Sequence, residues 1–149
     1  SLDASSESYP LHTFNLLNEG VMQKIAKAFK LQPSEIAGAT LDAGTVKADG
    51  FSGPAEGKVA VGLTNPDGKV SYAYSANGIG FWIAADGTAS SWGDTPIYYE
   101  YDASGYGLTV GHNPGHSEKS KTYIIKPTMV YNKGGKLHKA VITIKMKFA

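Results

Sequence analysis

The residues of this 149-residue chain best suited to contact a ligand are its two tryptophans. Trp92 lies in the segment Ser91-Trp92-Gly93-Asp94, where a flat ring stands beside a carboxylate and a hydroxyl. Sugar rings present apolar CH faces that stack on flat side chains, and their hydroxyls need a few polar partners. We therefore expect Trp92 to stack on a sugar and Asp94 to accept hydrogen bonds from its hydroxyls. The alternative is that Trp92 is buried and anchors a loop.

Alternation along a strand separates the other aromatic residues into core and candidate contacts. Phe81 shares a face with Ile79 and Ile83, whereas Trp82 points to the opposite face between Gly80 and Ala84. Trp82 is then either exposed or covered by the N-terminal helices. With a second stacking ring and a histidine hydrogen-bond partner added, the predicted ligand-binding residues are Trp82, Trp92, Asp94, Tyr106 and His112.

Metal binding and catalysis have weaker signals. His112 and His116 are four residues apart, but Pro114 and glycines make the segment a turn, so the helical spacing of two metal-binding imidazoles does not apply. Glycoside hydrolysis needs two converging carboxyls, and only Asp94, Glu100 and Asp102 cluster among aromatic residues. The alternative, which needs fewer assumptions, is that these acids lie at solvent-exposed positions on strands and form no catalytic pair. We expect no catalytic residue, no metal and no cofactor.

The composition limits the range of partners. The chain has no cysteine, which excludes disulfides and thiolate metal sites, and all fourteen of its basic residues are lysines. Without arginine the planar fork that reads guanine edges is missing, so specific nucleic-acid recognition is not expected. Eight lysines lie between Lys119 and Lys147. We interpret them as solvated outward positions on strands, with an anionic-ligand patch as the alternative.

The N-terminal segment predicts export. Residues 1–12 begin with small, polar and acidic side chains, which are typical of a flexible spacer following a processed signal or joining another module. No run of about 18 apolar residues exists, so we expect no transmembrane segment in this chain. A lipid anchor upstream of Ser1 is compatible with this interpretation, and the expected location is the cell surface or the exterior.

The remaining chain predicts a single mainly β domain over residues 13–149. Apolar residues at Val21, Ile25 and Phe29 mark one face of a helix, and residues 13–43 are expected to form a helical hairpin. Over residues 45–149 the period changes to two and short strands alternate with turns, in the order of a meander. Strand segments are expected at Val59–Leu63, Ile79–Ile83, Ile97–Tyr101, Leu108–Val110 and Tyr123–Tyr131, and in the last strand from Ala140 to Phe148. These features predict an antiparallel β-sandwich or similar fold with the helical hairpin packed on it.

The order of motifs from Asn77 to Tyr131 resembles a domain of unknown function found in exported and surface proteins of Bacteroides-type bacteria. The shared features are Gly80-Phe81-Trp82, Trp92-Gly93-Asp94, the loop Gly111-His112-Asn113-Pro114-Gly115 and a strand ending in Val130-Tyr131. His112 stands where this family usually has glutamine. The resemblance implies a β-sandwich-like surface module that is often associated with glycan capture or breakdown.

The leading hypothesis is a non-catalytic binding or adhesion module of the cell envelope, with a glycan or a surface protein as its partner. The competing hypothesis is a structural or protein-interaction module that uses its exposed aromatic residues to contact an adjacent enzyme domain or partner. A glycoside-active enzyme is the third hypothesis.

Overall fold

A computed structural model describes residues 1–15, 21–36, 40–41, 52–72, 79–102 and 107–149 of the chain. The described part is mainly β, as the sequence predicts, and its first sheet has five antiparallel strands in the order β1-β8-β7-β5-β6. These strands are β1 (Pro10–Asn15), β5 (Ile79–Ile83), β6 (Ala89–Ser90), β7 (Ile97–Asp102) and β8 (Gly107–His112). β7 pairs with β5 rather than with β6, so the expected simple meander is wrong here. β5 is therefore flanked by β6 on one side and by β7 on the other.

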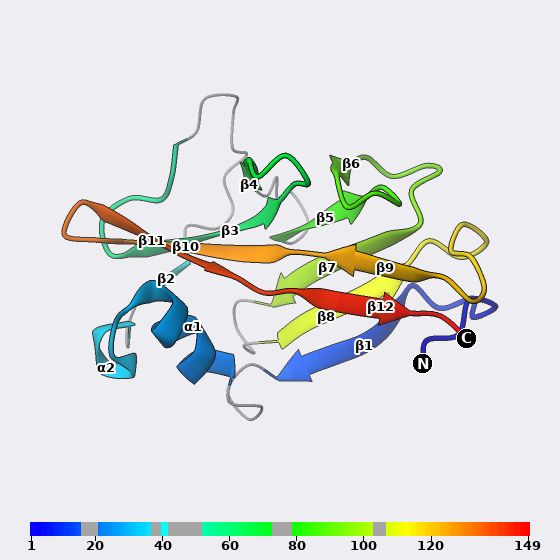
Figure 1. The fold of residues 1–149 in the computed structure, drawn as a ribbon, viewed down its shortest axis with the longest axis horizontal. Helices are drawn as coiled ribbons and strands as arrows, with labels where there is room; N and C mark the ends of the chain where they lie inside the picture. The colour runs from blue at the N-terminus through cyan, green and yellow to red at the C-terminus, as the bar shows by residue number, and fades with distance from the viewer. Residues whose placement is uncertain (16–20, 37–39, 42–51, 73–78, 103–106) are drawn as a thin grey trace.

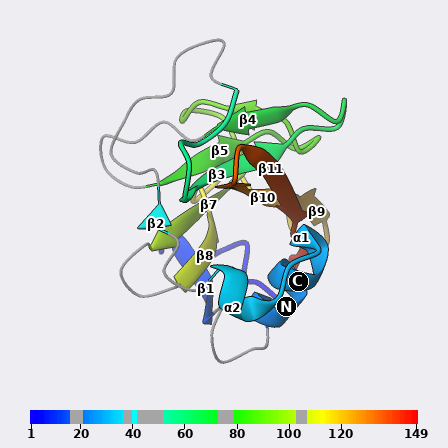
Figure 2. The ribbon, with the colours of Figure 1, turned by 90° about the vertical axis from the view of Figure 1, so that its left-hand side faces the viewer.

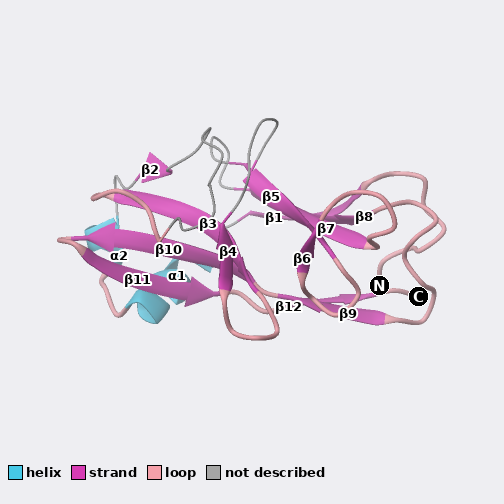
Figure 3. Cartoon of the chain, turned by 90° about the horizontal axis from the view of Figure 1, so that it is seen from above, coloured by secondary structure: helices cyan, strands magenta, loops and turns pink. Residues whose placement is uncertain are grey.

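The second sheet has the order β11-β10-β3-β2, and β4 also pairs with β3. Its strands are β2 (Thr40–Leu41), β3 (Lys58–Thr64), β4 (Val70–Tyr72), β10 (Pro127–Lys133) and β11 (Lys136–Val141). A two-stranded sheet of β9 (Thr122–Ile125) and β12 (Ile144–Lys147) continues β10 and β11 along the length of the molecule (Figure 3). The expected strand from Tyr123 to Tyr131 is thus two strands, divided at Lys126.

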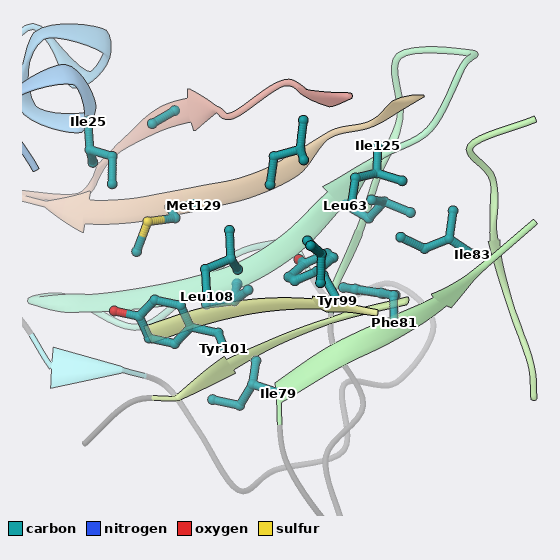
Figure 4. Packing of buried hydrophobic residues seen from close by; sticks show 14 of the residues in the cluster. Ile25, Leu63, Ile79, Phe81, Ile83, Tyr99, Tyr101, Leu108, Ile125 and Met129 are labelled. Carbon is teal, nitrogen blue, oxygen red and sulfur yellow. The ribbon is translucent and has the colours of Figure 1, made fainter. Parts of the chain in front are cut away.

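The core lies between the two layers of strands. Leu63 and Ile125 from one layer point towards Phe81 and Tyr99 from the other, and Met129 points towards Leu108 and Tyr101 (Figure 4). The buried Tyr99 hydroxyl donates a hydrogen bond to the carbonyl oxygen of Gly62 in β3, which ties the two sheets together. The expected last strand from Ala140 to Phe148 is divided between the end of β11 and β12. Its expected alternation is confirmed, because its even-numbered residues face the core or its margin and the odd-numbered ones are exposed.

Two helices cover one end of the sandwich (Figure 2). Helix α1 (Val21–Phe29) buries Ile25, Ala26 and Phe29 against the core, as its apolar spacing predicts. The Phe29 carbonyl oxygen lies 2.9 Å from Nδ1 of His138 in β11. The short helix α2 (Pro33–Ile36) follows and buries Ile36. No helix in the described part of the chain is long and apolar enough to cross a membrane.

The N-terminal residues differ from the sequence-based expectation. The expected flexible spacer over residues 1–12 is instead part of the fold, and the first residues expected to be helical belong to β1, which pairs with β8. Leu2 N donates to the carbonyl oxygen of Lys147 at 2.8 Å, and Ala149 N donates to that of Leu2 at 2.9 Å. Strand addition uses backbone groups, so a small and polar sequence can pair with an open sheet edge without an apolar pattern that reveals it.

Candidate ligand-binding face

The outward face of the first sheet is the candidate site. Strand register places Gly111 in β8, Tyr98 in β7, Trp82 in β5 and Ser90 in β6 side by side in one row across this face. The adjacent row contains Thr109, Glu100 and Gly80. Residues in both rows alternate with inward-facing core residues such as Phe81 and Tyr99, so the two rows point away from the core.

Three aromatic rings gather on this face. The rings of Trp82 and Tyr98 have centroids 5.0 Å apart and are tilted by 52°. Tyr9, which directly precedes β1, meets Trp82 edge to face at 6.2 Å and is 43% exposed. Tyr98 is only 6% exposed although it points outward, because its neighbours on the face cover it. We call the surface formed by Tyr9, Trp82 and Tyr98 the aromatic face.

Two glycines allow the rings to lie close to the sheet. A Cβ atom at Gly111 would come within 2.5 Å of Cε1 of Tyr98 and 2.1 Å of the carbonyl oxygen of Tyr9. A Cβ at Gly80 would come within 2.1 Å of the carbonyl oxygen of Tyr99. Neither position can take a side chain without displacing backbone. The absence of side chains here leaves room for the Tyr98 ring over Gly111 and leaves Trp82 without a bulky neighbour along β5.

Some polar groups beside the rings have no partner among the described residues. Neither the Tyr98 hydroxyl nor the Trp82 indole N–H makes a hydrogen bond with a described residue, and the exposed Glu100 carboxylate is likewise unpaired. Burial and the nearby Glu100 charge raise the pKa of Tyr98 to about 12, so its hydroxyl stays protonated near neutral pH. The aromatic face therefore combines ring surface with two donors and one acceptor.

Trp92 lies in the loop that joins β6 to β7 and is 65% exposed. This loop is held in place by its own hydrogen bonds: Thr95 Oγ1 donates to the Ser91 carbonyl at 2.9 Å, and Asn113 binds the loop through its backbone and its side chain. An exposed tryptophan in a loop anchored by other residues is not needed to pack that loop. The anchoring role considered for Trp92 is thus taken by Asn113 and Thr95.

Strand order brings the Trp92 loop next to Trp82. The loop leaves β6 after Ser90 and enters β7 before Tyr98, and both of these residues are cross-strand partners of Trp82. The loop therefore connects two strands that both pair with β5. Asp94 is exposed in the same loop. Of the five predicted site residues, Trp82 lies in β5, and Trp92 and Asp94 lie in the loop that follows Ser90, the partner of Trp82 in β6.

His112 is not part of this surface. It is completely buried and points inward in the same row as Ile97 and Ile83. Its Nε2 lies 3.0 Å from the carbonyl oxygen of Ser8 and its Nδ1 lies 2.7 Å from Oγ of Ser117, and its ring stacks on Phe148. Because both ring nitrogens are occupied inside the protein, the structure places His112 as a support between the two chain termini rather than as a contact for a ligand.

The fifth predicted site residue, Tyr106, lies outside the described residues. The residues that sequence reasoning missed are Tyr9, Tyr98 and Gly111. The alternation of Ile97, Tyr99 and Tyr101 already implied an outward Tyr98, but the pairing of β7 with β5, which puts it beside Trp82, is a property of the sheet order.

Among the residues that the structure describes, no group of three histidine, aspartate or glutamate side chains is placed to hold a metal ion.

Comparison with known families places this chain in a family whose function is not assigned. Residues 8–136 match a family model described as "Domain of unknown function (DUF4859)", which covers most of the chain. The chain belongs to this family. No curated protein and no solved structure shows significant similarity to the chain.

Proposed function

We propose that this domain is a non-catalytic carbohydrate-binding module that holds a glycan on the aromatic face, with Trp92 as a second stacking surface. The observation that supports this proposal is the cluster of the half-buried Trp82 and the exposed Tyr9 rings, beside polar groups that have no partner among the described residues. A sugar needs this combination, because its CH faces require a ring and its hydroxyls require both donors and acceptors.

The chemistry of the face favours a neutral sugar polymer over a charged one. Asp94 and Glu100 are exposed, Glu100 in the row next to the rings, and residues 70–118 contain no lysine or arginine. Acidic sugars would meet like charge at this face without a cation to balance them. The outward rows extend over several strands, so successive rings of an extended chain can be contacted together.

A glycan array followed by affinity electrophoresis in neutral plant and mucin polysaccharides tests this proposal. We expect the wild-type protein to be retarded in at least one neutral polysaccharide and the double variant Trp82→Ala/Trp92→Ala to migrate as it does without the polymer. The control is Leu137→Ala, which removes an exposed apolar side chain from the other sheet. Equal retardation of the double variant and the wild type would remove the aromatic face as the site.

The competing proposal of a protein-interaction module makes a different prediction. If no glycan binds and a protein partner co-purifies with the wild type but not with the double variant, the aromatic face is a protein interface instead. Export to the cell surface, and the kinship with glycan-associated surface domains of Bacteroides-type bacteria, are parts of the proposal. Detection of the protein on intact cells with an antibody tests the location.

A further inference from the structure

The charges of this protein divide between its two sheets. Residues 70–118, which supply four of the five strands of the first sheet, contain acids but no lysine or arginine. Residues 119–149, which supply β9, β10, β11 and β12, contain eight lysines and no acid. The two layers lie on opposite sides of the core (Figure 2). The molecule is therefore acidic on the side of the aromatic face and basic on the other side.

Strands β11 and β12 follow each other in one line along the molecule (Figure 1). From His138 to Met146 the even-numbered residues are buried or half-buried, and the odd-numbered residues from Leu137 to Lys147 are exposed. In β12, Lys145 lies opposite Ile124 of β9 and Lys147 lies opposite Thr122. We call this surface the basic face, and its main residues are Ile124, Lys126, Leu137, Lys139, Val141, Lys145 and Lys147.

The lysines of the basic face form no ion pairs among the described residues. Lys126, Lys139, Lys145 and Lys147 make no ion pair with a described residue, whereas Lys121 pairs with Glu118 at 3.3 Å. Three of the large apolar residues that are exposed in the described structure lie on this face: Ile124, Leu137 and Val141. Unpaired cations interleaved with exposed aliphatic side chains indicate a partner that offers both negative charge and an apolar layer.

We propose that the basic face docks on an anionic phospholipid surface. Lysines placed at a membrane surface are attracted by acidic headgroups, and aliphatic side chains gain by entering the boundary between headgroups and acyl chains. An acidic polysaccharide would satisfy the charge but offers no apolar layer for Ile124, Leu137 and Val141. The outward positions of β9, β11 and β12 also carry no aromatic ring for a sugar to stack on.

This inference does not depend on the proposed function, since it concerns the other sheet. If both hold, docking on the basic face turns the aromatic face away from the lipid. A glycan-binding surface would then point outward from the membrane that carries the protein.

Co-sedimentation with vesicles tests the proposal. The probe is vesicles of phosphatidylcholine with about 30% phosphatidylglycerol, with vesicles of phosphatidylcholine alone for comparison. We expect binding to the anionic vesicles only, and loss of that binding when sodium chloride is raised from about 0.1 M to about 0.5 M. The variant Lys145→Glu/Lys147→Glu should reduce the partition coefficient at least tenfold, and Ile124→Ser should reduce it severalfold.

The matched control is Lys24→Glu/Lys27→Glu, which changes the net charge by the same amount on the exposed side of α1. This control should keep most of the binding, and circular dichroism melting should show that all variants are folded. Equal loss in both charge variants would mean a net-charge effect and would overturn the proposal. Absence of vesicle binding would also overturn the proposal. Binding to polygalacturonate in place of vesicles would overturn it as well. A third contrary result would be self-association of the wild type that the Lys145→Glu/Lys147→Glu variant abolishes.

Discussion

Trp82 and Tyr98 are sixteen residues apart in the chain, yet their ring centroids lie 5.0 Å apart on the outward face of one sheet. They meet because β7 pairs with β5, which places the two residues directly opposite each other. On its other side, the Tyr98 ring occupies the space that the missing side chain of Gly111 leaves open. The pair forms the centre of the aromatic face, and the predictions below separate its binding role from its contribution to folding.

The first prediction concerns Trp92, whose side chain is mostly exposed. Trp92→Ala should lower the affinity for a bound glycan about tenfold, because a stacking ring contributes on the order of 1 kcal/mol beyond its buried area. The free energy of unfolding should change by less than about 0.5 kcal/mol, since exposed positions rarely affect it. Isothermal titration calorimetry and urea unfolding measure the two quantities. Unchanged affinity would remove Trp92 from the site.

The second prediction compares two adjacent tyrosines. Tyr99→Phe removes a buried hydroxyl that donates to Gly62 in the other sheet, so it should cost about 1 to 3 kcal/mol of stability. Tyr98→Phe removes a hydroxyl that makes no hydrogen bond to a described residue, so it should change stability little and lower glycan affinity severalfold. Urea unfolding measures the stability of both variants, and calorimetry measures their glycan affinity. The same stability loss in both would contradict it.

The third prediction tests the close approach at Gly111. Gly111→Ala places a methyl group where Cε1 of Tyr98 and the carbonyl oxygen of Tyr9 already lie, so either the ring or the start of β1 must move. We expect a loss of about 1 to 3 kcal/mol in stability, together with weaker glycan binding. Ser90→Ala, in the same row but exposed, serves as the control and should retain stability. A fully stable Gly111→Ala protein with normal binding would show that the packing is looser than described.

The fourth prediction concerns acid stability. The Glu56 carboxylate accepts hydrogen bonds from the backbone N–H groups of Gly134 and Gly135 at 2.7 and 2.8 Å, in the turn between β10 and β11. These bonds, with Gly134 first, lower the pKa of Glu56 from its ordinary value of 4.5. A lowered pKa in the folded state means that the stabilisation is present above pH 4.5 and is lost as the pH falls through the lowered value.

Replacing Glu56 by glutamine removes the charge but keeps the shape. The melting temperature of the wild type should exceed that of Glu56→Gln at pH 7, and the difference should shrink as the pH falls below 4.5. Asp67→Asn, at the β3–β4 turn, provides a comparison with another turn carboxylate. A difference between wild type and Glu56→Gln that stays constant from pH 7 to pH 3 would contradict this explanation.

The sequence alone determined the parts of this protein that depend on local periodicity. Alternation in the last strand separated its buried and exposed residues, and the spacing of Val21, Ile25 and Phe29 predicted α1. The opposite orientations of Phe81 and Trp82 were also predicted, because successive side chains of a strand point to opposite faces.

Only the tertiary structure decided which strands are neighbours. The insertion of β7 between β5 and β8 brought Tyr98 to Trp82, and the pairing of β1 with β8 brought Tyr9 beside them. The same pairing enclosed His112, which the sequence had suggested as a ligand contact. Strand pairing is made by backbone groups that all residues except proline share, so the side-chain sequence of one strand does not specify its partner.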